Sequence, residues 1–380
     1  MVRRTMLHWA GPVNIHSNGD VMPLRVSTSS DEELPAGAIG LRIHRGRLTV
    51  DSNLTVPSAM YHMIMAKKLL ADKQKEDSEN QSSNTVVGDG SEPGPSSSTS
   101  SVSCVEPPRC MIWSEREACE RQVTQISTSA CGATAVVNVF NALGVPVNIE
   151  RINASVGTRL RANTAPIPRY LLSRAVAGCT AADLAAGIHR ASDGLVTARF
   201  FPTYPERAMS LSHWLADWIS LGAVPILTQN LQNGCDSDVI PDAWHHQMVF
   251  GVSPRGIFLC NPVECVRETM LWPRLASPST LLVRASDVVD RFTNTTDLTP
   301  LLHVPDHRFE TYNVLGQVVN VIREWCAAGW QERLTQTRHI RLPAAYQAGI
   351  TIAALTGSEA HRRLMIATQL PILHPQNDPA

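Results

Sequence analysis

The sequence predicts an α+β fold in which a helical part is followed by an antiparallel sheet. Apolar side chains recur at helical spacing over 132–143 and over 210–221. The polarity then switches to a period of two, and short runs at 223–229, 245–252 and 256–261 are typical of strands. Because helices and strands are segregated along the chain instead of alternating, we expect an α+β protein.

The composition indicates a globular chain with one sizeable core. Of its 380 residues 43% are hydrophobic and 18% are charged, and 33 basic residues balance 34 acidic ones. This balance gives no electrostatic reason to expect nucleic acid or an anionic membrane as partner. No apolar run has the length of a signal peptide or a membrane span. Nine cysteines without framework spacing are typical of reduced thiols, so we expect a cytoplasmic protein.

A change in composition marks off the first part of the chain. Residues 1–71 are predicted to form a partly ordered N-terminal arm, with a strand-like run at 38–50 and a helix at about 60–73. Residues 72–108 are rich in Ser, Gly and Glu and contain almost nothing to bury. They are therefore predicted to be a disordered linker.

The rest of the chain is predicted to be a catalytic body, 109–300, and a C-terminal helical extension, 301–380. Within the extension, apolar spacing predicts helices at 314–325 and at about 344–368. Within the body, a further helix is predicted at 180–190 from its periodicity and the Thr-x-x-Asp pattern at its start. The sequence leaves the oligomeric state open.

Cys131 lies in the most informative segment of the chain. It stands at the first turn of the predicted helix, where the positive end of the helix dipole favours a thiolate. Thr128 or Ser129 is expected to cap this helix, and Gly144 to end it. Small residues on both sides of the cysteine leave room for a substrate backbone. We therefore expect Cys131 to be a nucleophile.

Gln125 and His245 are the first two expected partners of that nucleophile. Gln125 lies six residues before the cysteine, so its amide is expected to donate to a developing oxyanion together with the backbone N–H of Cys131. His245 opens one predicted strand, and Asn261 closes the next, so a short turn brings them together. Asn261 is then expected to accept from one ring nitrogen of His245 while the other nitrogen faces the thiol. His246 is the competing candidate for the base. Because side chains alternate along a strand, it points to the face opposite to that of His245.

These motifs resemble the papain-like cysteine peptidase fold, over less than half of the chain. The shared pattern is Q-x5-C-G, then H-x5-G on a strand, then Asn sixteen residues after the histidine. In detail the chain is similar to the bacteriocin-leader-peptidase-like branch, in which a Gly-x-x-Pro turn, here 222–225, precedes the histidine strand. The resemblance implies a helical part carrying the cysteine helix and an antiparallel sheet carrying His and Asn. The H-x5-G step implies His245, not His246, as the base.

The resemblance also implies a role for each residue. Cys131 would be the nucleophile, His245 the general base, Asn261 the orienting residue and Gln125 the oxyanion donor. The chain departs from papain in having Ala135 and Val136 where an aromatic residue is usual. It departs from the bacterial branch in having Asn in place of Asp before Pro262. Both departures bear on the substrate more than on the chemistry.

Other chemistry-bearing residues have simpler interpretations. Five possible metal ligands cluster in sequence: Cys235, His245, His246, Cys260 and Cys265. One C-x4-C pair is a poor zinc signature, so neither a metal nor a cofactor is expected. Trp244 is equally compatible with a wall of the active-site cleft and with a strand anchor. Arg159 and Arg161 are expected on a solvated face.

The sequence therefore predicts a cysteine peptidase, a hydrolase that cleaves a peptide or isopeptide bond through a thioester. Its expected partner is a peptide or protein substrate, not nucleic acid or a membrane. Two alternatives remain open: an acyltransferase or transglutaminase-like enzyme with the same triad, and a catalytically silent papain-like binding module.

Overall fold

The computed structural model describes most of the chain beyond residue 105. The described residues are 41–44, 47–50, 58–83, 106–234 and 240–373. The chain divides into two compact units, Met1–Thr55 and Val56–Ala380. In the first unit the described part is an antiparallel pair, β1 (Leu41–His44) and β2 (Arg47–Val50), at the place of the predicted strand-like run.

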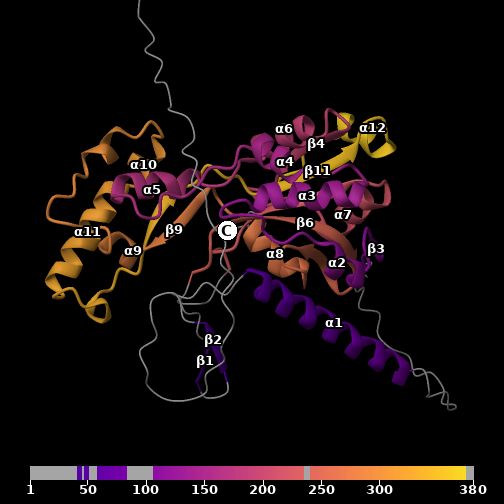
Figure 1. Ribbon diagram of the computed structural model, residues 1–380, viewed down its shortest axis with the longest axis horizontal. Helices are drawn as coiled ribbons and strands as arrows, with labels where there is room; N and C mark the ends of the chain where they lie inside the picture. The colour runs from indigo at the N-terminus through magenta and orange to yellow at the C-terminus, as the bar shows by residue number, and fades with distance from the viewer. Residues whose placement is uncertain (1–40, 45–46, 51–57, 84–105, 235–239, 374–380) are drawn as a thin grey trace, which may run out of the picture. The chain divides into compact units, whose positions relative to one another are not determined.

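A seven-stranded antiparallel sheet forms the centre of the second unit (Figure 1). Its strands follow the order β4-β11-β5-β6-β7-β8, and β3 pairs with β6 off this path. The strands are β3 (Cys110–Met111), β4 (Val196–Pro202), β5 (Val224–Asn230), β6 (Trp244–Ser253), β7 (Gly256–Cys260), β8 (Glu264–Val266) and β11 (Gly349–Leu355). The predicted antiparallel sheet after the first helices, and with it the α+β class, is confirmed.

Helices cover both faces of this sheet, which is why its central strands are apolar on both sides. On β5, Ile226 packs under one layer and Leu227 under the other. The first layer consists of α3 (Cys131–Leu143), α4 (Ile149–Val156) and α6 (Ala181–Ala191). The second layer consists of α7 (Leu211–Ser220), α8 (Glu268–Leu275) and α12 (Glu359–Ile366).

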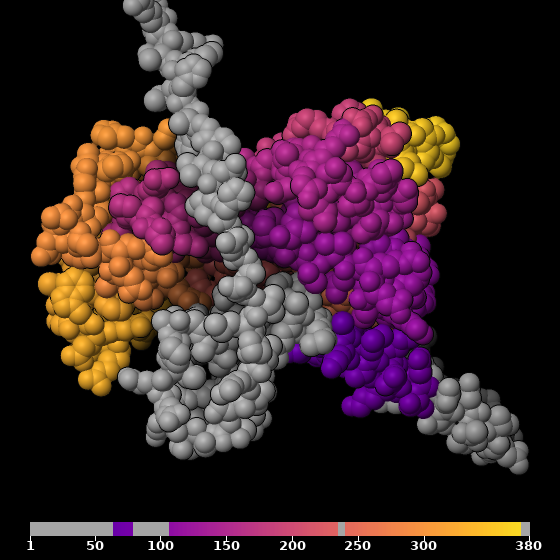
Figure 2. Space-filling model, in the orientation of Figure 1, coloured from indigo at the N-terminus to yellow at the C-terminus, as the bar shows by residue number. Residues whose placement is uncertain are grey.

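A second core lies beside the sheet and is built mainly from helices around Phe309, Val318 and Trp325. Figure 2 shows its surface in orange and that of α3 and α4 in magenta. Its elements are α5 (Ile167–Val176), β9 (Thr280–Arg284), α9 (Ala285–Val289), the 3-10 helix Thr299–His303, α10 (Arg308–Thr311), α11 (Val314–Ala327), the 3-10 helix Glu332–Leu334 and β10 (His339–Pro343). β9 and β10 pair antiparallel.

The predicted C-terminal helical extension is wrong in its second half. The helix expected at 314–325 is present as α11, but the region expected as one helix over 344–368 contains β11 before the short helix α12. β11 lies between β4 and β5, as the second strand from one end of the sheet. Its sequence, GITIAAL, has two β-branched isoleucines and a threonine, which favour a strand when both faces are buried. The last part of the chain therefore completes the body.

The predicted linker also begins too early. Residues 72–83 belong to α1 (Ser58–Ser83), and α2 (Glu115–Arg121) lies close to it. Residues 72–83 lack Gly and Pro and contain two each of Lys, Gln and Glu, which are good helix formers. Leu69 is buried, and Lys73 forms an ion pair with Glu115 that holds the helix to the body. The rest of the predicted linker up to 105, and most of the predicted arm before α1, lie outside the described residues.

Among the helices that the structure describes, none combines the length and the hydrophobicity of a membrane-spanning segment.

Candidate active site

Cys131 is the first residue of α3 and is only 5% exposed. The helix has Ala130 as N-cap without a side-chain cap, so neither Thr128 nor Ser129 caps it as predicted. Backbone N–H groups of Gly132 and His246 donate to the Cys131 sulfur instead. The first amides of the helix thus remain directed at the cysteine and its surroundings, where they favour negative charge.

Two buried polar residues of α3 hold the segment that leads into the cysteine. The Asn138 side chain accepts from the Val123 N–H at 2.7 Å and donates to the Val123 carbonyl at 3.0 Å. One turn earlier, Thr134 Oγ1 accepts from the Ile126 N–H at 3.1 Å. Because both partners lie within eight residues of Cys131, these bonds fix the approach of the chain to the nucleophile.

Gly132 explains why a glycine follows the cysteine. A Cβ at this position would lie 2.2 Å from the Cys179 sulfur and 3.2 Å from Cδ2 of His246. The start of α3 therefore packs directly on these two side chains, and only glycine permits the approach.

His245 is the histidine that contacts the Cys131 sulfur. Its Nε2–H donates to the backbone carbonyl of Asn261 at 2.7 Å, and the side chain also forms a hydrogen bond with Cys131. The bond to Asn261 fixes the tautomer and leaves Nδ1 for the sulfur. The strand register explains why His245 lies next to Asn261, because Met248 of β6 pairs with Cys260 at the end of β7, directly before Asn261.

The pKa values of the two groups shift toward an ion pair. Burial by itself raises the pKa of the Cys131 thiol, but the hydrogen bond and charge of His245 and two backbone N–H groups outweigh it, so the pKa is lowered from its ordinary value. Burial likewise lowers the pKa of His245, but Cys131, the Asn261 carbonyl and the charge of Glu264 outweigh it, and the pKa is raised. The arrangement favours thiolate and imidazolium.

Asn261 orients the imidazole through its main chain and not through its side chain. Its side-chain Nδ2 is buried and has no hydrogen-bond partner, whereas its carbonyl accepts from His245. The residue has a φ of 64°, a left-handed conformation that Asn tolerates better than most residues. Its N–H donates to Oε1 of Gln122 at 3.1 Å. The predicted side-chain hydrogen bond is thus replaced by a backbone one.

The Gln125 side chain forms a hydrogen bond within its own loop in place of the predicted oxyanion contact. Its side-chain amide donates to the Ser127 carbonyl at 3.1 Å, two residues further along the same loop. Gln122 is linked to the site through the Asn261 N–H, a connection that the sequence pattern did not indicate.

His246 and Cys179 form a second pair behind the first. Nδ1 of His246 lies 3.0 Å from the Thr228 hydroxyl, and Nε2 lies 3.2 Å from the Cys179 carbonyl and 3.5 Å from its sulfur. Burial lowers the pKa of His246 to about 4 and raises that of the Cys179 thiol well above its ordinary value. His246 is therefore a neutral core residue, and the geometry favours His245 in the competition between the two.

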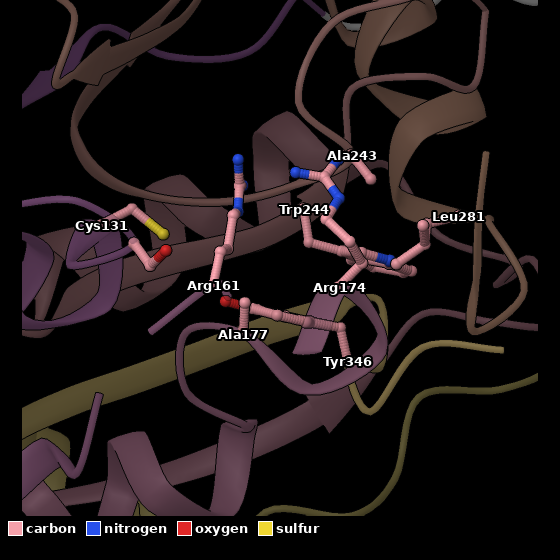
Figure 3. A pocket seen from close by; sticks show the side chains of 9 residues that line it. Cys131, Arg161, Arg174, Ala177, Ala243, Trp244, Leu281 and Tyr346 are labelled. Atoms are coloured by element: carbon pink, nitrogen blue, oxygen red, sulfur yellow. The ribbon is translucent and has the colours of Figure 1, made fainter. Parts of the chain in front are cut away.

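A small pocket opens beside Cys131 between the sheet and the second core (Figure 3). Trp244 and Tyr346 stack in its wall with ring centroids 5.5 Å apart, so Trp244 both lines the pocket and anchors its strand. The lining residues are Ser129, Cys131, Arg161, Arg174, Ala177, Ala243, Trp244, Leu281 and Tyr346. Arg161 was expected on a solvated face, and neither Arg174 nor Tyr346 was singled out from the sequence.

Within the described part of the chain, no group of three or more His, Cys, Asp or Glu residues is arranged to hold a metal ion. No protein-family model and no curated protein matches the sequence significantly.

Proposed function

We propose that the protein is a cysteine-dependent hydrolase of papain-like architecture that cleaves a peptide or isopeptide bond through a thioester. The observation that carries the proposal is the contact between Cys131 and His245 at the start of α3, with both pKa values shifted toward the ion pair. Perturbed pKa values of a nucleophile and its base beside a pocket are typical of catalytic sites.

The proposed reaction uses the residues in the following way. The Cys131 thiolate attacks the substrate carbonyl, and the carbon–sulfur bond forms as the carbonyl π electrons move to oxygen. The carbon–nitrogen bond then breaks, and the His245 imidazolium gives its proton to the departing amine. Neutral His245 next takes a proton from water, and the resulting hydroxide displaces the thiolate and releases a carboxylic acid.

The oxyanion would be stabilised mainly by backbone groups. The N–H of Cys131 at the start of α3 is the first candidate donor, since the helix begins there without a side-chain cap. Gln125 would have to leave its bond to the Ser127 carbonyl before it reached the carbonyl oxygen. Gln122 contributes as a positioning residue. Its side chain accepts from the N–H of Asn261, and the carbonyl of Asn261 in turn accepts from His245.

A reducing setting suits this chemistry, because a thiolate nucleophile is lost on oxidation. The cysteines in the described residues are free, including Cys131 and its neighbour Cys179. We therefore also propose a cytoplasmic location.

Labelling the full chain with a thiol-directed peptidyl epoxide, followed by mass spectrometric mapping, tests the proposal. We expect modification of Cys131 at neutral pH ahead of all other cysteines. Adding a primary amine during turnover of a peptide mixture then decides the acceptor: free acids indicate hydrolysis, and amides indicate acyl transfer. Equal labelling of Cys131 and the other thiols would contradict an activated nucleophile and favour a silent binding module.

A further inference from the structure

Two arginines line the pocket beside the nucleophile and share one carboxylate. Nη1 of Arg161 lies 2.7 Å from Oδ1 of Asp242, and Nη1 of Arg174 lies 3.7 Å from the same oxygen. In Figure 3 both side chains extend in the same direction, and the guanidinium group of Arg174 lies near Ala243. Both arginines line the pocket, whereas Asp242 does not.

The charge of Arg174 is poorly compensated. Its side chain is only 14% exposed, whereas that of Asp242 is 63% exposed. Its Nε is buried and has no hydrogen-bond partner among the residues that the structure describes. Burial lowers the pKa of Arg174, and the charge of Arg161 lowers it further. A buried guanidinium with unused donors is energetically costly unless an anion completes its hydrogen bonds.

The charged groups around Arg174 do not neutralise its positive charge. Among the described residues, the other nearby carboxylate is that of Asp287, which accepts from the Tyr170 hydroxyl at 3.3 Å. Arg291 lies over the Tyr170 ring, 3.9 Å from its centroid, and adds a third guanidinium group to this region. The three arginines and two aspartates leave one positive charge in excess.

The remaining lining offers the other half of a binding site. The Ser129 hydroxyl is buried and has no hydrogen-bond partner, and it lies in the loop two residues before Cys131. Leu281, Trp244 and Tyr346 provide apolar walls. Apolar walls lower the local dielectric constant, so a hydrogen bond between guanidinium and an anion is stronger there than in water.

We propose that Arg161 and Arg174 form a carboxylate-binding subsite next to Cys131, which selects substrates with an acidic group close to the bond that is cleaved. This inference rests on the proposed function, since it assigns a substrate class to the same site. The carboxylate belongs either to an Asp or Glu side chain or to the C-terminus of the substrate. In both cases it takes the unused N–H donors of the two arginines in the bidentate geometry that guanidinium groups favour.

A pair of small alkylating reagents tests the subsite without knowledge of the substrate. Iodoacetate carries a carboxylate next to its reactive carbon, and iodoacetamide is its neutral counterpart. We expect the rate ratio of the two reagents at Cys131, measured by mass spectrometry, to fall about tenfold in Arg174→Gln, equivalent to about 1.4 kcal/mol. Because His245 also attracts anions, the change between variants is the diagnostic quantity.

Three further variants make this test decisive. Arg161→Gln should lower the ratio in the same direction and carries the test if Arg174→Gln does not fold by circular dichroism. Arg174→Lys should restore most of the ratio because it keeps the charge. Arg169→Gln removes an exposed arginine of the same helix that does not line the pocket and should leave the ratio within about twofold. An unchanged ratio in Arg174→Gln and Arg161→Gln would overturn the subsite.

Peptide arms then identify the source of the carboxylate. Glu peptides are compared with Gln peptides, and free C-termini with amidated ones, by cleavage in the wild-type chain and in Arg174→Gln. If the wild-type chain prefers Glu peptides and the variant does not, the bound carboxylate is that of a side chain. If the preference is for the free C-terminus, it is the terminal carboxylate. No preference in either pair overturns the subsite. Slow alkylation of Cys131 by iodoacetamide itself would instead refute the proposed function, so the two failures are distinguishable.

Discussion

Two cysteine–histidine pairs lie side by side in the body of this protein, and they differ in their ionisation. Cys131, Cys179 and His246 are buried, and His245 is partly buried. In the first pair the pKa of the thiol is lowered and that of the imidazole is raised. In the second pair both pKa values move the opposite way, and burial is the largest cause.

The difference lies in the hydrogen bonds that surround each pair. The sulfur of Cys131 receives two backbone N–H groups at a helix start, and a backbone carbonyl holds the imidazolium form of His245. The sulfur of Cys179 has no comparable donors, and its neighbour His246 stays neutral between a hydroxyl and a carbonyl. Burial alone therefore favours neutral groups, and in the first pair the mutual hydrogen bond and charges of Cys131 and His245, together with backbone groups, outweigh it.

Removing each sulfur in turn tests the comparison with the largest expected effect. Cys131→Ala should lower peptide turnover by about 10⁴-fold or more, because the covalent pathway is lost. Cys179→Ala should retain turnover within a few-fold, since its thiol is a packing group. Initial rates and circular dichroism of both variants provide the measurement. A similar loss in both would show that the pairs are not functionally distinct.

The two histidines give the next largest contrast. His245→Ala should lower the alkylation rate of Cys131 at pH 7 by about 10²-fold and move the inflection of its pH profile upward, because the lowered pKa of the thiol depends on the imidazolium. His246→Asn should keep the profile, because its side chain faces Cys179. Iodoacetamide kinetics between pH 5 and 10 check this prediction.

Acid stability separates the pairs in another way. The pKa of His246 is about 4 in the folded chain, against 6.5 ordinarily, so the unfolded state binds more protons between these values. His246 therefore stabilises the fold above pH 6.5, and about 3 kcal/mol is lost as the pH falls toward 4. Urea unfolding at pH 4.5 and 7 should show a smaller acid loss in His246→Asn. The matched control is His303→Asn, which replaces an exposed histidine and should not change the acid loss.

The backbone role of Asn261 predicts the smallest effect. Asn261→Gly keeps the carbonyl that binds His245 and tolerates the positive φ, so Cys131 labelling should stay within about twofold. Asn261→Ala keeps the carbonyl but should destabilise the fold by about 1 kcal/mol, because alanine is strained in the left-handed region. A tenfold loss of labelling in the glycine variant would restore the side-chain role that the sequence predicted.

The sequence predicted local features better than long-range ones. Periodicity gave the helix that starts at Cys131 and the strands that carry His245 and precede Asn261, because the spacing of apolar residues reports burial directly. It did not reveal β11, since a short apolar run after a predicted helix fits either structure. Residues 72–83 continue a helix instead of starting a linker, because their helix propensity matters more here than their low hydrophobicity.

Within the site, the sequence predicted the identity of residues but not which atoms act. Every residue has a backbone carbonyl, so the residue type at 261 does not show that its carbonyl acts, and the sequence indicates a side-chain role for Asn261. Gln122 and Gln125 differ by three residues in one loop, and spacing alone does not show which one the loop turns toward the site. Arg161, Arg174 and Tyr346 meet Cys131 only through tertiary structure, and no motif connects them.

The position of β11 has a consequence for synthesis of the chain. Cys131 and His245 are translated before residues 349–355, yet β4 joins the sheet only when β11 enters between β4 and β5. Tyr346, which closes one wall beside the thiol, leaves the ribosome in the same late segment. A nascent polypeptide that ends before residue 346 therefore carries Cys131 and His245 but lacks both β11 and the Tyr346 wall of the pocket.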